Sequence, residues 1–179
     1  MNNTQFGFGN DKVIRSLMTV GAVVANKSAK QIEQETIKQG KVDLAWLKLE
    51  SVLPITQAGI IADLLRGEER LHFAEKMTEF RKIAESMPRL RTTDGQGGDA
   101  VVALHYFANG AGDWWVTEWE PRDYAFGLCD PFGDPHCMEL GSLSLEEMAE
   151  SPRVELDLHW RKGTTIDQAK IRKYPATFS

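Results

Sequence analysis

The sequence predicts an α+β protein in which a helical N-terminal half packs on an antiparallel sheet of four or five strands with one short helix. Apolar residues recur at helical spacing up to about residue 86, and after Pro88 they form short runs separated by turn residues. The composition changes at the same place. The net charge is +1 over residues 1–86 and −6 over residues 87–179, and four of the five tryptophans follow residue 86. We therefore expect two regions of different architecture.

The expected helical region covers residues 11–87, after a flexible N-terminus of residues 1–10. A first helix is expected at 11–25, where apolar residues follow a helical stripe. Residues 26–40 form a polar stretch in which Ile32 and Ile37 are the only large apolar side chains. Asp43 is expected to be the N-cap of the next, short helix.

Thr56 begins the strongest helical pattern of the chain. Gly67 interrupts the apolar stripe, and the pair Met87–Pro88 stops it, because the residue before a proline is disfavoured in a helix. We expect two helices here, separated by a break near Gly67.

An antiparallel-sheet domain is expected over residues 88–165, followed by a C-terminal tail of residues 166–179 that is a frayed helix or an extended segment. Connections between the strands are too short for parallel crossovers, so the sheet must be antiparallel. Ser144 is expected to cap the one short helix, at 145–150. The expected strands are 100–108, 114–120, 124–129, 139–143 and 154–160.

The second half also carries an ordered series of short motifs. They are Met87–Thr93, Val101–Phe107, Trp115–Glu118, Phe126–Leu128, Glu139–Gly141, Ser144–Met148 and Val154–Trp160. In this order and spacing, about residues 87–165 resemble a domain family of unknown function that is common on conjugative plasmids, integrative elements and phages. The loop 130–138 is longer than the family pattern, and Leu156 stands where the family often has a basic residue. The resemblance implies a mobile-element setting and brings no established activity.

The loop Cys129–Cys137 is the densest set of possible metal ligands. Cys129, His136 and Cys137 could supply three corners of a zinc tetrahedron. However, seven residues separate the two cysteines, so the close pair that orients two ligands on one turn is missing. We expect no bound metal and no cofactor.

Three carboxylates within the family-like motifs, Glu118, Glu139 and Asp157, are the candidates for catalysis. Converging carboxylates can act as acid and base or bind magnesium. The simpler expectation is that they lie on the wet face of the sheet, because exposed sheet faces are commonly charged.

Four tryptophans, Trp114, Trp115, Trp119 and Trp160, form the candidate binding surface. On a regular strand Trp115 and Trp119 share one face and Trp114 points to the other. An exposed tryptophan suits a partner protein or a stacked base. The net charge of −6 argues for a protein, since a nucleic acid site needs lysine and arginine around it.

The function expected from these features is that of a mobile-element accessory protein, a non-enzymatic module that binds a host or element-encoded protein, with counter-defence as one such role. One alternative is a metal-dependent enzyme that uses the sheet carboxylates and the Cys129–Cys137 loop. A second is a plasmid-encoded factor associated with nucleic acid. We expect a cytoplasmic location without a membrane anchor, because the longest apolar run, Leu17–Ala25, falls short of the about 20 residues that a membrane helix needs.

Overall fold

The computed structural model describes residues 27–110, 112–122 and 124–178. The chain divides into two compact units, residues 1–35 and 36–179. The terminus expected at 1–10 and the helix expected at 11–25 lie outside the described residues. Among the described helices, none combines the length and the apolarity that a bilayer span requires.

The first described helix, α2, runs from Ala29 to Leu49 and includes most of the polar stretch 26–40. Ser28 begins this helix: its Oγ accepts from the Gln31 amide at 3.3 Å, and the Gln31 side chain accepts from the Ser28 amide at 2.9 Å. The buried residues of α2 are only Gly40, Asp43 and Leu47. A helix with so few large apolar residues shows little apolar periodicity. Apolar periodicity therefore did not predict the start of α2.

Asp43 is a buried residue inside α2 and not the expected N-cap. Its carboxylate accepts from the side-chain Nε2 of Gln39 at 2.8 Å, from the Thr78 hydroxyl at 2.7 Å and from the Arg81 guanidinium at 2.9 Å. Gly40, on the same side of α2, would place a Cβ only 2.4 Å from Cα of Ala74. The backbones of the two helices therefore approach so closely at Gly40 that a larger residue would clash. Asp43 pairs with Thr78 and Arg81 of the same neighbouring helix.

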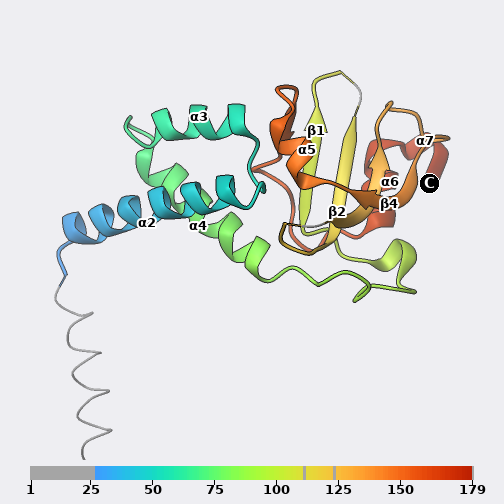
Figure 1. Cartoon of the computed structure of the whole chain (residues 1–179), viewed down its shortest axis with the longest axis horizontal. Coiled ribbons are helices and arrows are strands. Elements are labelled where there is room, and N and C mark those ends of the chain that lie inside the picture. The colour runs from blue at the N-terminus through green and yellow to red at the C-terminus, as the bar shows by residue number, and fades with distance from the viewer. Residues whose placement is uncertain (1–26, 111, 123, 179) are drawn as a thin grey trace, which may run out of the picture. The chain divides into compact units, whose positions relative to one another are not determined.

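The neighbouring helices are α3, Ile55–Leu64, and α4, Arg70–Glu85 (Figure 1). The break expected near Gly67 is confirmed. Apolar residues of the three helices and of the sheet form one cluster, so the expected packing of helices on the sheet is also confirmed. The hydroxyl of Tyr106 donates to the Val52 carbonyl at 2.7 Å across this core.

The sheet has the order β4-β3-β2-β1-β5 and is antiparallel throughout, as expected. Its strands are Leu104–Ala108 (β1), Asp113–Trp119 (β2), Ala125–Asp130 (β3), Glu139–Leu143 (β4) and Val154–Leu156 (β5). The last strand stops before the expected residue 160. Asp157 causes this, because its carboxylate accepts from the His159 amide at 2.9 Å and turns the chain.

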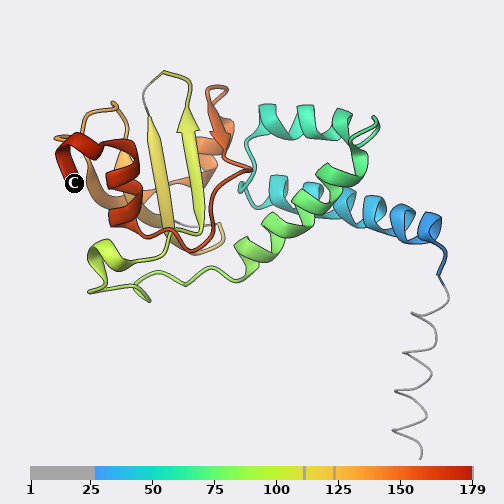
Figure 2. The ribbon, with the colours of Figure 1, turned by 180° about the vertical axis from the view of Figure 1, so that it is seen from behind.

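The two faces of the sheet carry different helices, and we name them after these helices (Figures 1 and 2). The α5 face packs with α5, Leu145–Glu150, whose Leu145 and Met148 join the large apolar cluster. The α6 face packs with α6, Ile166–Lys173, whose Ile166 and Ala169 join a second, smaller cluster.

The segment 166–179 was expected to be a frayed helix or an extended segment, and where the structure describes it, it forms two helices joined at Tyr174. Thr165 caps α6 through a capping box with Gln168, and Ile166 and Ala169 are buried. A short helix, α7, follows at Pro175–Phe178. The segment thus contributes core residues to the sheet domain.

Candidate functional site

The tryptophans do not share one surface. The register of β2 against β3 shifts between Val116 and Glu118, and this irregularity places Trp119 on the α5 face while Trp115 lies on the α6 face. The expectation that Trp115 and Trp119 share a face is therefore wrong. Both rings are buried, and Trp114 and Trp160 are half-buried.

Glu118 is buried and not on a wet face of the sheet. Its carboxylate accepts from the Thr93 hydroxyl at 2.6 Å, from the Thr93 amide and from the Arg91 amide at 2.7 Å. Burial alone raises the pKa of this carboxyl, but the donors of Thr93 and Arg91 outweigh it, so the pKa is lowered. Glu118 thereby holds the 91–93 loop against the sheet.

The other two candidate carboxylates have different surroundings. Glu139 is exposed on β4, whereas Asp157 Oδ2 lies 3.1 Å from Nδ1 of His105. Each of the three candidates thus has its own environment. A catalytic role for them stays a prediction.

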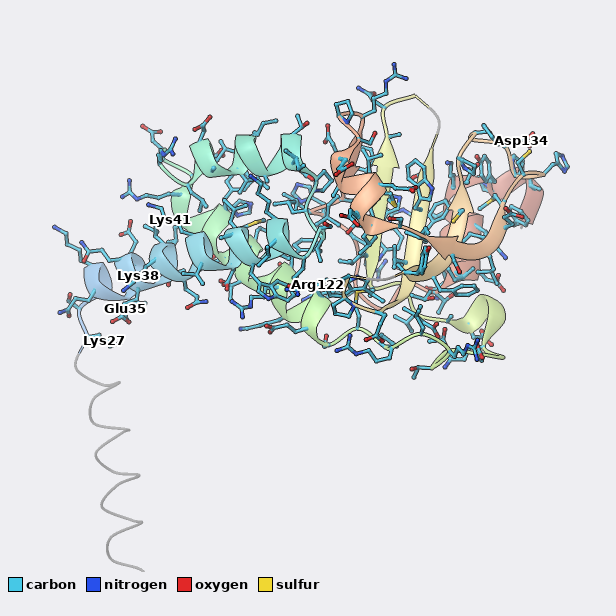
Figure 3. The ribbon with its side chains drawn as sticks, in the orientation of Figure 1. Lys27, Glu35, Lys38, Lys41, Arg122 and Asp134 are labelled. Carbon is cyan, nitrogen blue, oxygen red and sulfur yellow. The ribbon has the colours of Figure 1, made fainter. Side chains whose placement is uncertain are left out.

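The loop Cys129–Cys137 is organised by the carboxylates of Asp130 and Asp134, the second of which is labelled in Figure 3. Asp134 donates its amide to Asp130 at 3.0 Å and accepts from the His136 amide at 2.9 Å. Cys129 is half-buried, and burial together with the charge of Glu139 raises its thiol pKa to about 11, which disfavours the thiolate that zinc needs. Within 27–110, 112–122 and 124–178, no group of three or more histidine, cysteine, aspartate or glutamate side chains could hold a metal ion.

A charged cluster on the α6 face was not found from the sequence. Asp113 and Asp130 stand opposite each other in the register of β2 and β3. Lys173, at the end of α6, lies between them, 2.7 Å from Oδ2 of Asp130 and in contact with Oδ2 of Asp113. The hydroxyl of Tyr174 donates to Asp130 at 2.6 Å. The ammonium group thus bridges two facing carboxylates.

His105 extends this cluster across β1. Its Nε2 lies 2.8 Å from Asp113 and its Nδ1 lies 3.1 Å from Asp157. The ring stacks on Trp115 at a centroid distance of 5.4 Å and lies 4.7 Å from the ring of Trp160. Burial lowers the pKa of His105, but the hydrogen bonds to Asp113 and Asp157 outweigh this effect, so the pKa is raised. With a carboxylate beside each ring nitrogen, the protonated ring can donate to both.

The geometry of the cluster favours a structural role over chemistry. In its protonated form His105 donates from both nitrogens and has no lone pair left to act as a base. The ammonium of Lys173 occupies the position between Asp113 and Asp130 that a cation would need. These paired charges join the end of α6 to β1, β2 and β3.

The facing of Asp113 and Asp130 depends on the register shift between Val116 and Glu118, since the pairing of Trp119 with Ala125 would otherwise place Asp113 opposite Pro131. Trp114 pairs with Cys129, so the residues one step further out, Asp113 and Asp130, must face each other. Two carboxylates in that position require a cation.

An acidic surface lies along β4 and α5. It consists of Glu139, Glu146, Glu147 and Glu150, which are exposed and form no ion pair among the described residues. The strand β4 is also an edge of the sheet. No other strand in the described part of the chain pairs with its outer side.

The opposite edge, β5, is closed. The side chain of Gln57 donates to the Leu156 carbonyl and accepts from the Leu156 amide, each at 2.9 Å. An amide side chain thereby takes the place of a neighbouring strand, and the two edges of the sheet differ in what they offer to a partner.

A family model described as a protein of unknown function (DUF2958) matches residues 69–169, more than half of the chain. The protein belongs to the DUF2958 family. The match confirms the resemblance of the second half to a family of unknown function. The DUF2958 region extends beyond the expected 87–165 at both ends, to include α4 and the buried Ala169 of α6. No curated protein and no solved structure matches the chain.

Proposed function

We propose that this DUF2958 protein is a non-enzymatic protein-binding module of a mobile genetic element, acting in the cytoplasm on a host or element-encoded protein. The partner contributes an extended, basic segment that pairs with β4 and contacts α5. The mobile-element setting comes from the family resemblance, and counter-defence is one role that such a module fills.

The observation that carries the proposal is the difference between the two sheet edges. Gln57 satisfies the backbone of Leu156 at β5, whereas within the described residues β4 has no neighbour on its outer side. An open edge strand binds an extended peptide through main-chain hydrogen bonds.

The charge of the surface specifies the partner. Glu139 on β4 and Glu146, Glu147 and Glu150 on α5 are exposed. Complementary charge steers association and suppresses wrong partners, so a basic segment fits this surface and a nucleic acid does not.

A pull-down from nuclease-treated host lysate tests the proposal with two charge-reversed variants of the full chain. In Glu146→Lys/Glu150→Lys the acidic surface is altered. The control, Glu68→Lys/Glu75→Lys, changes the net charge equally at exposed positions of the helical region. We expect a protein that binds the wild type and the control but not the first variant, and whose binding slows amide exchange in β4.

The proposal is contradicted if the partner is captured equally by Glu146→Lys/Glu150→Lys and by the control variant. It is also contradicted if capture disappears on nuclease treatment. Capture without protection of the β4 amides contradicts the edge-strand mode.

A further inference from the structure

A basic hollow opens beside the turn that leads into α6. Its volume is about 530 Å³, and it is lined by His159, Arg161, Lys162, Gly163, Thr164, Gln168 and Arg172. This size falls within the roughly 300–1,000 Å³ that small-molecule sites occupy. No lining residue is acidic, although the chain as a whole carries a net charge of −5.

The backbone around the hollow is held on both sides. Thr164 is buried, and its hydroxyl donates to the Arg161 carbonyl at 2.7 Å. The Thr164 carbonyl accepts from the Val102 amide at 2.9 Å, and the Trp160 indole donates to the Val102 carbonyl at 3.3 Å. The turn 161–164 is thus fixed to the sheet, which reduces the cost of ordering it when a ligand binds.

The cations of the hollow differ in how they are paired. Lys162 lies 2.8 Å from Glu79 of α4. In the part of the chain that the structure describes, Arg161 and Arg172 form no ion pair, and both are exposed. Two arginines on the rim of one hollow are therefore available to a ligand.

We propose that this hollow binds a small molecule that carries phosphoryl groups, at a site separate from the acidic surface. The guanidinium group of arginine matches phosphate oxygens with paired hydrogen bonds. The side-chain NH2 of Gln168 and the ammonium of Lys162 add further donors. A carboxylate has only two oxygens and leaves part of this donor set unused.

The charge distribution selects a small ligand over a nucleic acid. The field of two arginines reaches only about one screening length, roughly 8 Å at physiological ionic strength. A long polyanion would extend beyond this distance. It would then be repelled by the rest of residues 87–179, which have a net charge of −6.

Isothermal titration calorimetry on the full-length protein at physiological salt tests the proposal. The probes are inorganic phosphate, ATP without magnesium and a short single-stranded DNA. We compare the wild type with Arg161→Gln/Arg172→Gln and with the control Arg66→Gln/Arg153→Gln, which removes the same charge at exposed positions outside the hollow. Thermal melting of each variant verifies folding.

The expected result is that phosphate or ATP binds the wild type and the control, and that Arg161→Gln/Arg172→Gln weakens this binding by about tenfold or more. Three results would overturn the proposal. They are absence of binding by both small probes, equal weakening in the two variants, and tighter binding of the DNA than of ATP.

Discussion

The two faces of the sheet are stabilised by different interactions. The α5 face is apolar: Leu104, Val116 and Trp119 are buried among helix residues, and the Tyr106 hydroxyl has its acceptor in Val52. The α6 face contains paired charges beside a smaller apolar cluster.

This difference determines how each face responds to change. On an apolar face the loss scales with the surface and cavity created, so each residue contributes separately. On a charged face the loss depends on whether the remaining partners stay paired, so removing one charge costs more than removing the set. The predictions below test this contrast.

The largest effect is expected for Trp119→Ala on the α5 face. Trp119 is 3% exposed, and its ring meets the ring of Trp46 edge-on at 6.4 Å. Truncating a buried tryptophan costs about 3–5 kcal/mol of unfolding free energy. Urea denaturation measures the loss. The control Leu49→Ala, at an exposed position, is expected to change stability by less than about 0.5 kcal/mol. A loss below about 1 kcal/mol for Trp119→Ala would place the main core elsewhere.

The next effect is expected for Lys173→Met on the α6 face. The substitution removes the cation that lies between Asp113 and Asp130, and leaves Asp113 only its contact with His105. Because the side chains of Lys173 and Asp113 are 22% and 20% exposed, water reduces the penalty. We expect a loss of about 2–4 kcal/mol in unfolding free energy, smaller than for a fully buried pair.

The triple variant Lys173→Met/Asp113→Asn/Asp130→Asn sharpens this test. Neutralising both carboxylates removes the unpaired charges, so it is expected to regain much of the lost stability. A triple variant less stable than Lys173→Met would show that the residues act separately, as on the α5 face.

A smaller, pH-dependent effect is expected for His105→Gln. The folded-state pKa of His105 is raised, so its extra stabilisation is fully present below the unfolded-state pKa and is lost as the pH rises through the folded-state pKa. Asp157, whose folded-state pKa is lowered, stabilises above the ordinary pKa of aspartate and loses this contribution on acidification. The stability difference between wild type and variant is therefore largest at a pH above the ordinary pKa of aspartate and below the unfolded-state pKa of histidine.

We expect that difference to be about 1–3 kcal/mol at weakly acidic pH and smaller at alkaline pH. Urea denaturation across the pH range measures it. A difference that is constant, or that grows as the pH rises, contradicts a protonated His105.

The smallest effect is expected for Thr165→Ala, which removes the cap of α6. Loss of such a cap costs about 0.5–2 kcal/mol. Amide exchange is expected to accelerate in α6 and not in α5. Ser144 caps α5, and its Oγ accepts from the Glu147 amide at 3.2 Å. The matched variant Ser144→Ala removes this cap and is expected to accelerate exchange in α5 instead. Equal acceleration in both helices would indicate that the two faces are coupled.

The sequence predicted what depends on local pattern. The approximate positions of the five strands, the break near Gly67 and the cap at Ser144 all follow from residues close together in the chain, and the structure confirms them. The capping boxes Ser28–Gln31 and Thr165–Gln168 were equally visible in the sequence and would have identified the start of α2 and of α6.

What the sequence did not predict depends on one-residue shifts and on distant pairings. The irregularity between Val116 and Glu118 turned Trp119 to the other face. The partners of Glu118 come from the 91–93 loop, and those of His105 lie 8 and 52 positions away. Helical or strand periodicity carries no information about such contacts.

The most direct test of the contrast between the two faces is an NMR titration of the His105 ring nitrogens in the full-length protein. A ring held between Asp113 and Asp157 is expected to carry protons on both nitrogens and to titrate with a pKa above the ordinary value of histidine. In Asp157→Asn the pKa is expected to fall, because one of the two carboxylates that stabilise the imidazolium is lost. A His105 that titrates at or below the ordinary value, with one ring nitrogen unprotonated at weakly acidic pH, would contradict the account of the α6 face as a face stabilised by paired charges.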